Sequence, residues 1–134
     1  MSKAYFALLV LGLLFLAGCP VEEYVEPGAI AVWQQQEGND WEIRYSLWND
    51  VLSKWYTPSG SPTALIAQLP GADHDPYVDS DGVSTALSVW NHEGTIYFSK
   101  WKGYSWSSPS AIAETGGTDS DPAVALGDSG ALAV

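Results

Sequence analysis

Residues 95–106 read TIYFSKWKGYSW, a stretch in which side chains alternate in character up to a Lys-Gly pair. In a strand this period places Ile96 and Phe98 on one face of the sheet. Tyr97, Ser99 and Trp101 then lie on the opposite face. The Lys-Gly pair marks a turn, so the stretch predicts a hairpin whose first strand is residues 95–101.

A similar phrase occurs earlier, where residues 42–55 read EIRYSLWNDVLSKW. Other segments repeat in the same order: IAVW at 30–33 and LSVW at 87–90, SPTALIA at 61–67 and SPSAIAE at 108–114, DHDPYV at 73–78 and DSDPAV at 119–124, and ALSV at 86–89 and ALAV at 131–134. The copies change length only at predicted turns, where chains tolerate insertions. The chain is therefore expected to repeat one structural unit.

One unit reads as a series of short antiparallel strands, expected near residues 75–78, 84–90, 95–101 and 105–113 and separated by turns such as DSDG and NHEG. Four such strands in roughly 45 residues match the size of a β-propeller blade. A β-sandwich is the alternative, although it would not require a sequence repeat. The predicted fold class is all-β, with about two propeller-type blades.

The repeat divides residues 29–134 into a partial blade at 29–72, a blade at 73–118 and the start of another at 119–134. A closed propeller needs about four blades or more. We therefore expect a fragment of a longer protein, or a chain that associates with others to cover its edges.

Residues 1–18 have the composition of a signal peptide, with Lys3 before a helical apolar run from Ala4 to Ala17. This run is shorter than the about 20 residues that span a bilayer. The junction at 16–19, Leu-Ala-Gly-Cys, resembles a bacterial lipobox. The resemblance implies cleavage before Cys19 and acylation of that residue, for example with palmitate, so that the membrane is a partner.

Residues 19–28 read CPVEEYVEPG and form an acidic tether between the anchor and the repeats. Pro rather than Asp follows Cys19, which favours the outer membrane or the cell surface within the cell envelope. The net charge is −11, so the chain offers no basic surface for phosphates. Nucleic acid is not an expected partner.

Residues 99–106 resemble the Asp-box, or BNR repeat, of sialidases, which reads Ser/Thr-x-Asp-x-Gly-x-Thr-Trp. Ser99, Gly103, Ser105 and Trp106 match this frame, whereas Trp101 stands in place of the Asp. The resemblance implies a sialidase-like propeller. In that family the Ser hydroxyl satisfies turn amides and the final Trp packs between strands, away from the active site.

The first copy keeps Ser46, Trp48 and Trp55 but has a longer turn without Gly. By analogy, we expect the tryptophans of both copies to pack between strands and blades. Stacking of a carbohydrate on Trp48 or Trp101 is the alternative.

Catalysis has little support in the sequence. Sialidases use an arginine triad, but Arg44 is the only Arg of the chain. Retaining glycosidases need only two carboxylates about 5 Å apart, and no acidic residue has a context that identifies it as one. His74 and His92 lie in turn-rich segments and are expected to face solvent.

We therefore predict a non-catalytic binding or scaffold module, whose partner is a carbohydrate or a protein. The alternative is a fragment of a sialidase-like or other glycoside hydrolase whose catalytic blades are missing.

Residues 73–82 read DHDPYVDSDG, in which Asp73, Asp75, Asp79 and Asp81 are closely spaced. Hard oxygen ligands and a Gly turn are features of Ca²⁺ loops, although this segment does not match the EF-hand frame. Asp-Pro and Asp-Gly are also ordinary turn formers. Turn chemistry is expected, with Ca²⁺ as the alternative and no other cofactor.

Overall fold

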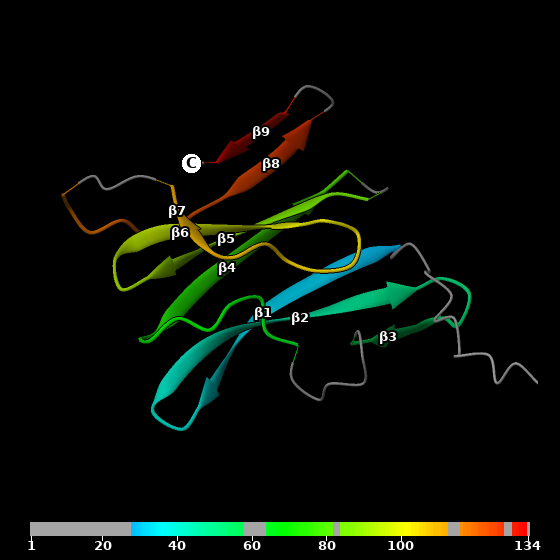
Figure 1. Ribbon diagram of the computed structural model, residues 1–134, viewed down its shortest axis with the longest axis horizontal. Coiled ribbons are helices and arrows are strands. Elements are labelled where there is room, and N and C mark those ends of the chain that lie inside the picture. The colour runs from blue at the N-terminus through cyan, green and yellow to red at the C-terminus, as the bar shows by residue number, and fades with distance from the viewer. Residues whose placement is uncertain (1–27, 58–63, 82–83, 113–115, 128–129, 134) are drawn as a thin grey trace, which may run out of the picture.

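A computed structural model of the chain describes residues 28–57, 64–81, 84–112, 116–127 and 130–133 (Figure 1). The predicted signal peptide, Cys19 and the acidic tether up to residue 27 lie outside these residues. Within them every regular element is a strand, so the all-β prediction is confirmed. None of the described segments is a helix that could cross a membrane.

The strands form three separate antiparallel sheets. The first sheet contains β1 (Ala29–Glu37), β2 (Asp40–Asn49) and β3 (Lys54–Tyr56). The second contains β4 (Asp73–Ser80), β5 (Ala86–His92), β6 (Thr95–Trp101) and β7 (Ser110–Ala111). The third contains β8 (Val124–Gly127) and β9 (Gly130–Ala133).

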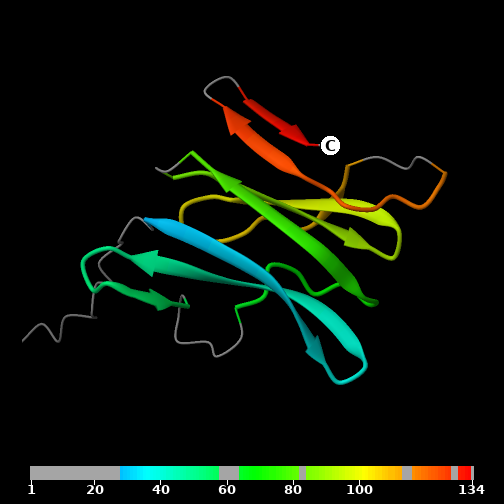
Figure 2. The ribbon, with the colours of Figure 1, turned by 180° about the vertical axis from the view of Figure 1, so that it is seen from behind.

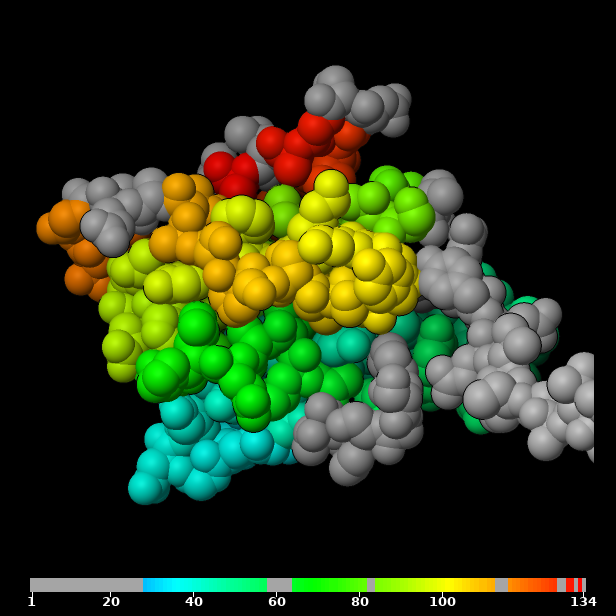
Figure 3. Space-filling view, in the orientation of Figure 1, coloured from blue at the N-terminus to red at the C-terminus, as the bar shows by residue number. Residues whose placement is uncertain are grey.

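The three sheets are stacked in the order in which they occur along the chain, from the first to the third (Figures 1 and 3). Seen from behind, β1, β4 and β8 run side by side along one side of the stack (Figure 2). The described residues do not form a closed barrel or propeller. In the stack, one face of the first sheet packs on the opposite kind of face of the second.

The predicted strand bounds agree best with the structure where polar and apolar side chains alternate. β6 has the predicted bounds, and β4 and β5 overlap the predicted ranges. The last strand is much shorter than the predicted 105–113 range, because only Ser110–Ala111 continues the ladder. Pro109, which has no N–H to donate, directly precedes this short strand.

The repeat is visible in individual hydrogen bonds. The Ser46 hydroxyl donates to the carbonyl oxygen of Tyr56 at 2.9 Å, and the Ser99 hydroxyl donates to that of Ser107 at 2.7 Å. Both acceptors directly follow the second Trp of their copy. In both copies this hydroxyl donates to a backbone carbonyl, which differs from the bond to a turn amide that the resemblance implies.

The tryptophans of each hairpin also form equivalent pairs. Trp48 lies opposite Trp55 with ring centroids 5.5 Å apart, and Trp101 lies opposite Trp106 at 5.6 Å. In the second copy Gly103 has a φ of 91°, a left-handed value that a Gly adopts without strain. The predicted inter-strand packing is therefore confirmed in both copies.

In both copies, the segment after the hairpin pairs with the same edge of its sheet. The N–H of Ile66 donates to the Ile43 carbonyl, and the N–H of Ile112 donates to the Ile96 carbonyl, both at 2.9 Å. Ile66 therefore corresponds to Ile112, one residue away from the match that the sequence alone suggests. The first sheet thus gains a further paired segment at Ala64–Ile66.

The hydrophobic core lies between the first and second sheets. Ile43, Tyr45 and Leu47 on β2 pack with Trp90 and Trp101 of the second sheet. The ring of Tyr45 lies 5.8 Å from that of Trp101. Because every one of these side chains is less than a tenth exposed, the contact between these two sheets supplies most of the described apolar burial.

Candidate functional site

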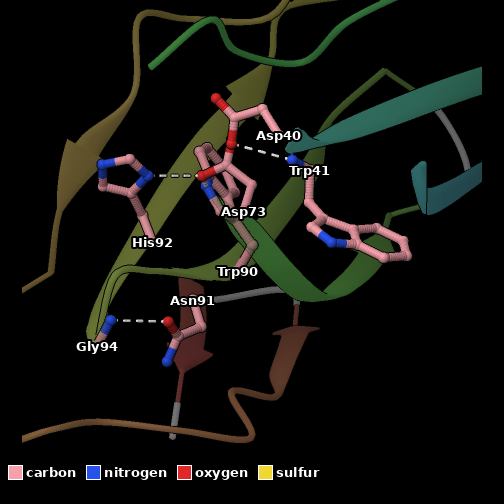
Figure 4. Close-up of polar contacts among 7 residues, drawn as sticks. All are labelled: Asp40, Trp41, Asp73, Trp90, Asn91, His92 and Gly94. Atoms are coloured by element: carbon pink, nitrogen blue, oxygen red, sulfur yellow. Dashed lines mark hydrogen bonds and ion pairs between the residues drawn. The ribbon is translucent and has the colours of Figure 1, made fainter. Parts of the chain in front are cut away.

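A group of acidic and aromatic side chains lies where the β1–β2 turn meets the start of β4 and the end of β5 (Figure 4). The sheets position it because the antiparallel register sets Asp73 directly opposite His92. Trp90, two residues before His92, points to the same face of β5. Asp40 and Glu42 reach the site from the start of β2.

Asp73 is the centre of this group and is 0% exposed. One of its oxygens, Oδ1, accepts a hydrogen bond from the indole N–H of Trp90 at 3.0 Å and lies 2.8 Å from Nδ1 of His92. The other, Oδ2, is buried without a hydrogen-bond partner. Asp73 therefore links two side chains of β5 and is shielded from solvent.

The two histidines do not face solvent as predicted. The side chain of His92 is 12% exposed, bound to Asp73 and in contact with the ring of Tyr97, 5.2 Å away. His74 is half-buried, with its ring 5.6 Å from that of Trp41. The prediction was wrong for His92, because its partner Asp73 lies 19 residues earlier in the sequence.

Burial raises the pKa of the Asp73 carboxyl above its ordinary value of 3.8, against the opposing effects of His92 and Trp90. The pKa of Glu42 is also raised above 4.5, first by burial and then by the negative charges of Asp73 and Asp40. Glu42 Oε2 is buried without a hydrogen-bond partner. The group therefore concentrates negative charge between the first two sheets.

The chemistry open to this group is limited by access. Asp73 has no exposed surface, so it cannot touch a substrate. A glycosidase pair needs both carboxylates beside the sugar, and Asp73 with Glu42 does not meet that condition. Within the described ranges, no set of three or more His, Cys, Asp or Glu side chains could hold a metal ion.

The remaining aspartates of the predicted cluster have separate roles. Asp75 has a φ of 52° at the irregularity of β4, and its N–H donates to Gln34 of β1 at 2.8 Å. Asp79 Oδ2 accepts from the N–H of Leu126 at 2.7 Å, which joins the second sheet to the third.

Asp81 Oδ1 accepts from the N–H groups of Ser84 and Thr85, at 3.0 and 2.9 Å, and so closes a turn. Turn and strand chemistry therefore accounts for Asp75, Asp79 and Asp81. These contacts show no set of oxygen ligands that the aspartates share, so they do not support the alternative of a Ca²⁺ site.

The candidate stacking tryptophans differ in access. Trp101 is 2% exposed, so neither face of its ring is open and the stacking hypothesis fails there. Trp48 is half-buried, with its N–H donating to Asp50 Oδ1 at 2.8 Å. Arg44 is 3% exposed and paired with Glu37, so it is not presented to a ligand in solution.

Sequence reasoning missed Asp40 and Glu42 as members of the acidic group. They lie in the first copy, whereas Asp73 begins the second. The repeat gave one weak indication. The β1–β2 turn, beside which Asp40 and Glu42 lie, is the counterpart of the β5–β6 turn that follows His92. No spacing rule, however, relates residues that meet across two stacked sheets.

In a comparison with known proteins, no family model matches the chain, and no curated protein or solved structure is significantly similar to it.

Proposed function

We propose that the chain is a lipid-anchored, extracytoplasmic binding or scaffold module built from β-propeller-type repeats. One observation carries the proposal: the first and second sheets repeat the same serine bond, tryptophan pair and returning edge segment. Repeated sheets that pack face to face are the construction of propeller blades. Such a stack offers a rigid surface to a partner.

A non-catalytic role fits the side chains at the candidate site. The most buried carboxylate, Asp73, has no surface open to a substrate. Arg44, the only Arg of the chain, is held inside the first sheet by Glu37. These interactions lie within single sheets. We therefore place function on the outer surfaces of the stack.

The anchor is tested by expressing the full chain in a Gram-negative host that is fed an alkyne fatty acid. We expect label on the protein and recovery in the membrane fraction, because acylated Cys19 would hold it there. The Cys19→Ser variant should lose the label and leave the membranes. Labelling that persists in Cys19→Ser would contradict the anchor, whereas Ser99→Ala should be labelled like the wild type.

A further inference from the structure

Equivalent faces of the first two sheets have different neighbours. The tryptophan face of the second sheet carries Trp90, Tyr97, Trp101 and Trp106, and that of the first carries Trp33, Arg44, Trp48 and Trp55. The registers match, since Trp33 lies opposite Arg44 as Trp90 lies opposite Tyr97. These two faces are therefore copies of one surface.

The second of these faces is the more fully covered: on the first face Arg44 and Ser46 are buried, but the tryptophans are not. Trp90 and Trp101 are 0% and 2% exposed, because β2 of the first sheet packs on them. Their counterparts on the first sheet differ, as Trp33 is 39% exposed and Trp48 is half-buried. Trp55 is 49% exposed. Large aromatic side chains on one sheet face typically mark a contact surface.

The cover of the second sheet is an isoleucine stripe, made of Ile43, Tyr45 and Ile66. Ile43 and Ile66 are 0% and 5% exposed. The chain contains a second isoleucine stripe at the corresponding positions of the second sheet: Ile96, Phe98 and Ile112. There Ile112 is 45% exposed and the other two are half-buried.

The third sheet leaves part of this second stripe open. Its strand β8 lies against β4 and β5, whereas the stripe lies on β6 and the segment after β7. The chain therefore exposes a second copy of each surface of its internal interface. One is the tryptophan face of the first sheet, and the other is the isoleucine stripe of the second sheet.

Arg44 lies in the part of the first tryptophan face that the chain itself covers. Its side chain is 4% exposed, and its Nε and NH1 atoms are buried without hydrogen-bond partners. Buried donors without acceptors are costly. Because these atoms are already enclosed by the chain, a docked partner would contact Trp33 and Trp48 and not Arg44 itself.

We propose that a second copy of this chain docks with its isoleucine stripe at Ile96, Phe98 and Ile112 on the tryptophan face of the first sheet. The contact reuses the packing seen between the first and second sheets. It joins two different surfaces, so it is head-to-tail and generates rings or filaments. The inference deepens the proposed scaffold function, on which it rests, by naming the partner.

The test is sedimentation velocity of the full chain in mild detergent over a series of concentrations. The wild type is expected to form species larger than a monomer that grow with concentration. Trp33→Lys and Ile112→Lys should each weaken association at least about tenfold. Tyr104→Lys changes a side chain that is 74% exposed on a turn outside both surfaces, and should associate like the wild type.

Mixing the two disrupted variants gives the sharpest result. Trp33→Lys keeps its isoleucine stripe and Ile112→Lys keeps its tryptophan face, so the mixture should form dimers of one chain of each and nothing larger. Circular dichroism of each variant alone checks that it is folded.

Three results would overturn the proposal. A wild type that stays monomeric has no such contact. Association that Trp33→Lys abolishes and Ile112→Lys leaves unchanged indicates a symmetric contact instead. If Cys19→Ser abolishes association, the wild type associates only because its acyl chains share a detergent micelle. The membrane anchor would then remain supported, and the proposed docking of one copy on another would be wrong.

Discussion

The first and second sheets share a frame but not an environment. In both, a Ser hydroxyl bonds the carbonyl that follows the second Trp, and the two tryptophans pair across the hairpin. Yet Trp33 is 39% exposed and its counterpart Trp90 is 0% exposed. The difference arises because the second sheet has the first packed on its tryptophan face.

This comparison separates two kinds of information in the repeat. Bonds within a hairpin depend on nearby residues, so both copies have them. Burial depends on which sheet lies alongside, so it differs between copies of the same residue. A repeated Trp is therefore a core residue in one copy and a surface residue in the other.

The largest expected difference concerns this tryptophan pair. Trp90→Ala should lower the free energy of unfolding by about 3–5 kcal/mol, because it leaves a cavity and removes a donor to Asp73. Trp33→Ala should cost about 1 kcal/mol, since the ring is already partly in water. Urea unfolding followed by circular dichroism measures both, and equal losses would contradict the difference in environment.

A smaller effect is expected from the shared serines. Ser46→Ala and Ser99→Ala should each cost about 1 kcal/mol, because each removes one equivalent hydrogen bond. Ser80→Ala, at an exposed position, should change stability by less than about 0.5 kcal/mol. If unfolding curves show that only one of the two shared serines matters, the hairpins are not equivalent.

The smallest effect is a pH dependence at the junction of the two sheets. The pKa values of Asp73 and Glu42 are raised on folding, so the folded chain binds these protons more tightly than the unfolded chain. Their contribution to stability is present below their ordinary values of 3.8 and 4.5, and is lost as pH rises through the raised values.

Melting temperatures measured across that pH range would test this effect. Asp73→Asn and Glu42→Gln should each flatten the fall in stability with rising pH, because neither replacement ionises. Ser99→Ala removes no titrating group and should keep the wild-type slope. A slope unchanged in both carboxyl variants would show that burial at the junction does not control these protons.

Local patterns predicted the hairpins well. Alternation predicted the bounds of Thr95–Trp101, and Glu93-Gly94, the second half of the Asn-His-Glu-Gly segment, forms the turn after β5. The pairing of Trp101 with Trp106 also followed from the hairpin frame. These features depend on neighbours a few residues away, which a single sequence displays.

Contacts between strands and sheets could not be predicted in this way. His92 was expected in solvent, but its partner Asp73 lies 19 residues earlier, across the β4–β5 pair. Glu42 joins the acidic group only because the first sheet packs on the second. The lipid anchor at Cys19 and the closure of the repeats into a propeller stay predictions.

The central claim is that the isoleucine stripe of the first sheet covers the tryptophan face of the second. A double-mutant cycle between Tyr45 and Trp106, whose rings are 5.6 Å apart, tests it directly. We expect Tyr45→Ala and Trp106→Ala to show a coupling energy of about 0.5–1.5 kcal/mol. Tyr45→Ala with Tyr104→Ala should be additive, and a Tyr45–Trp106 coupling near zero would contradict the stacking of the two sheets.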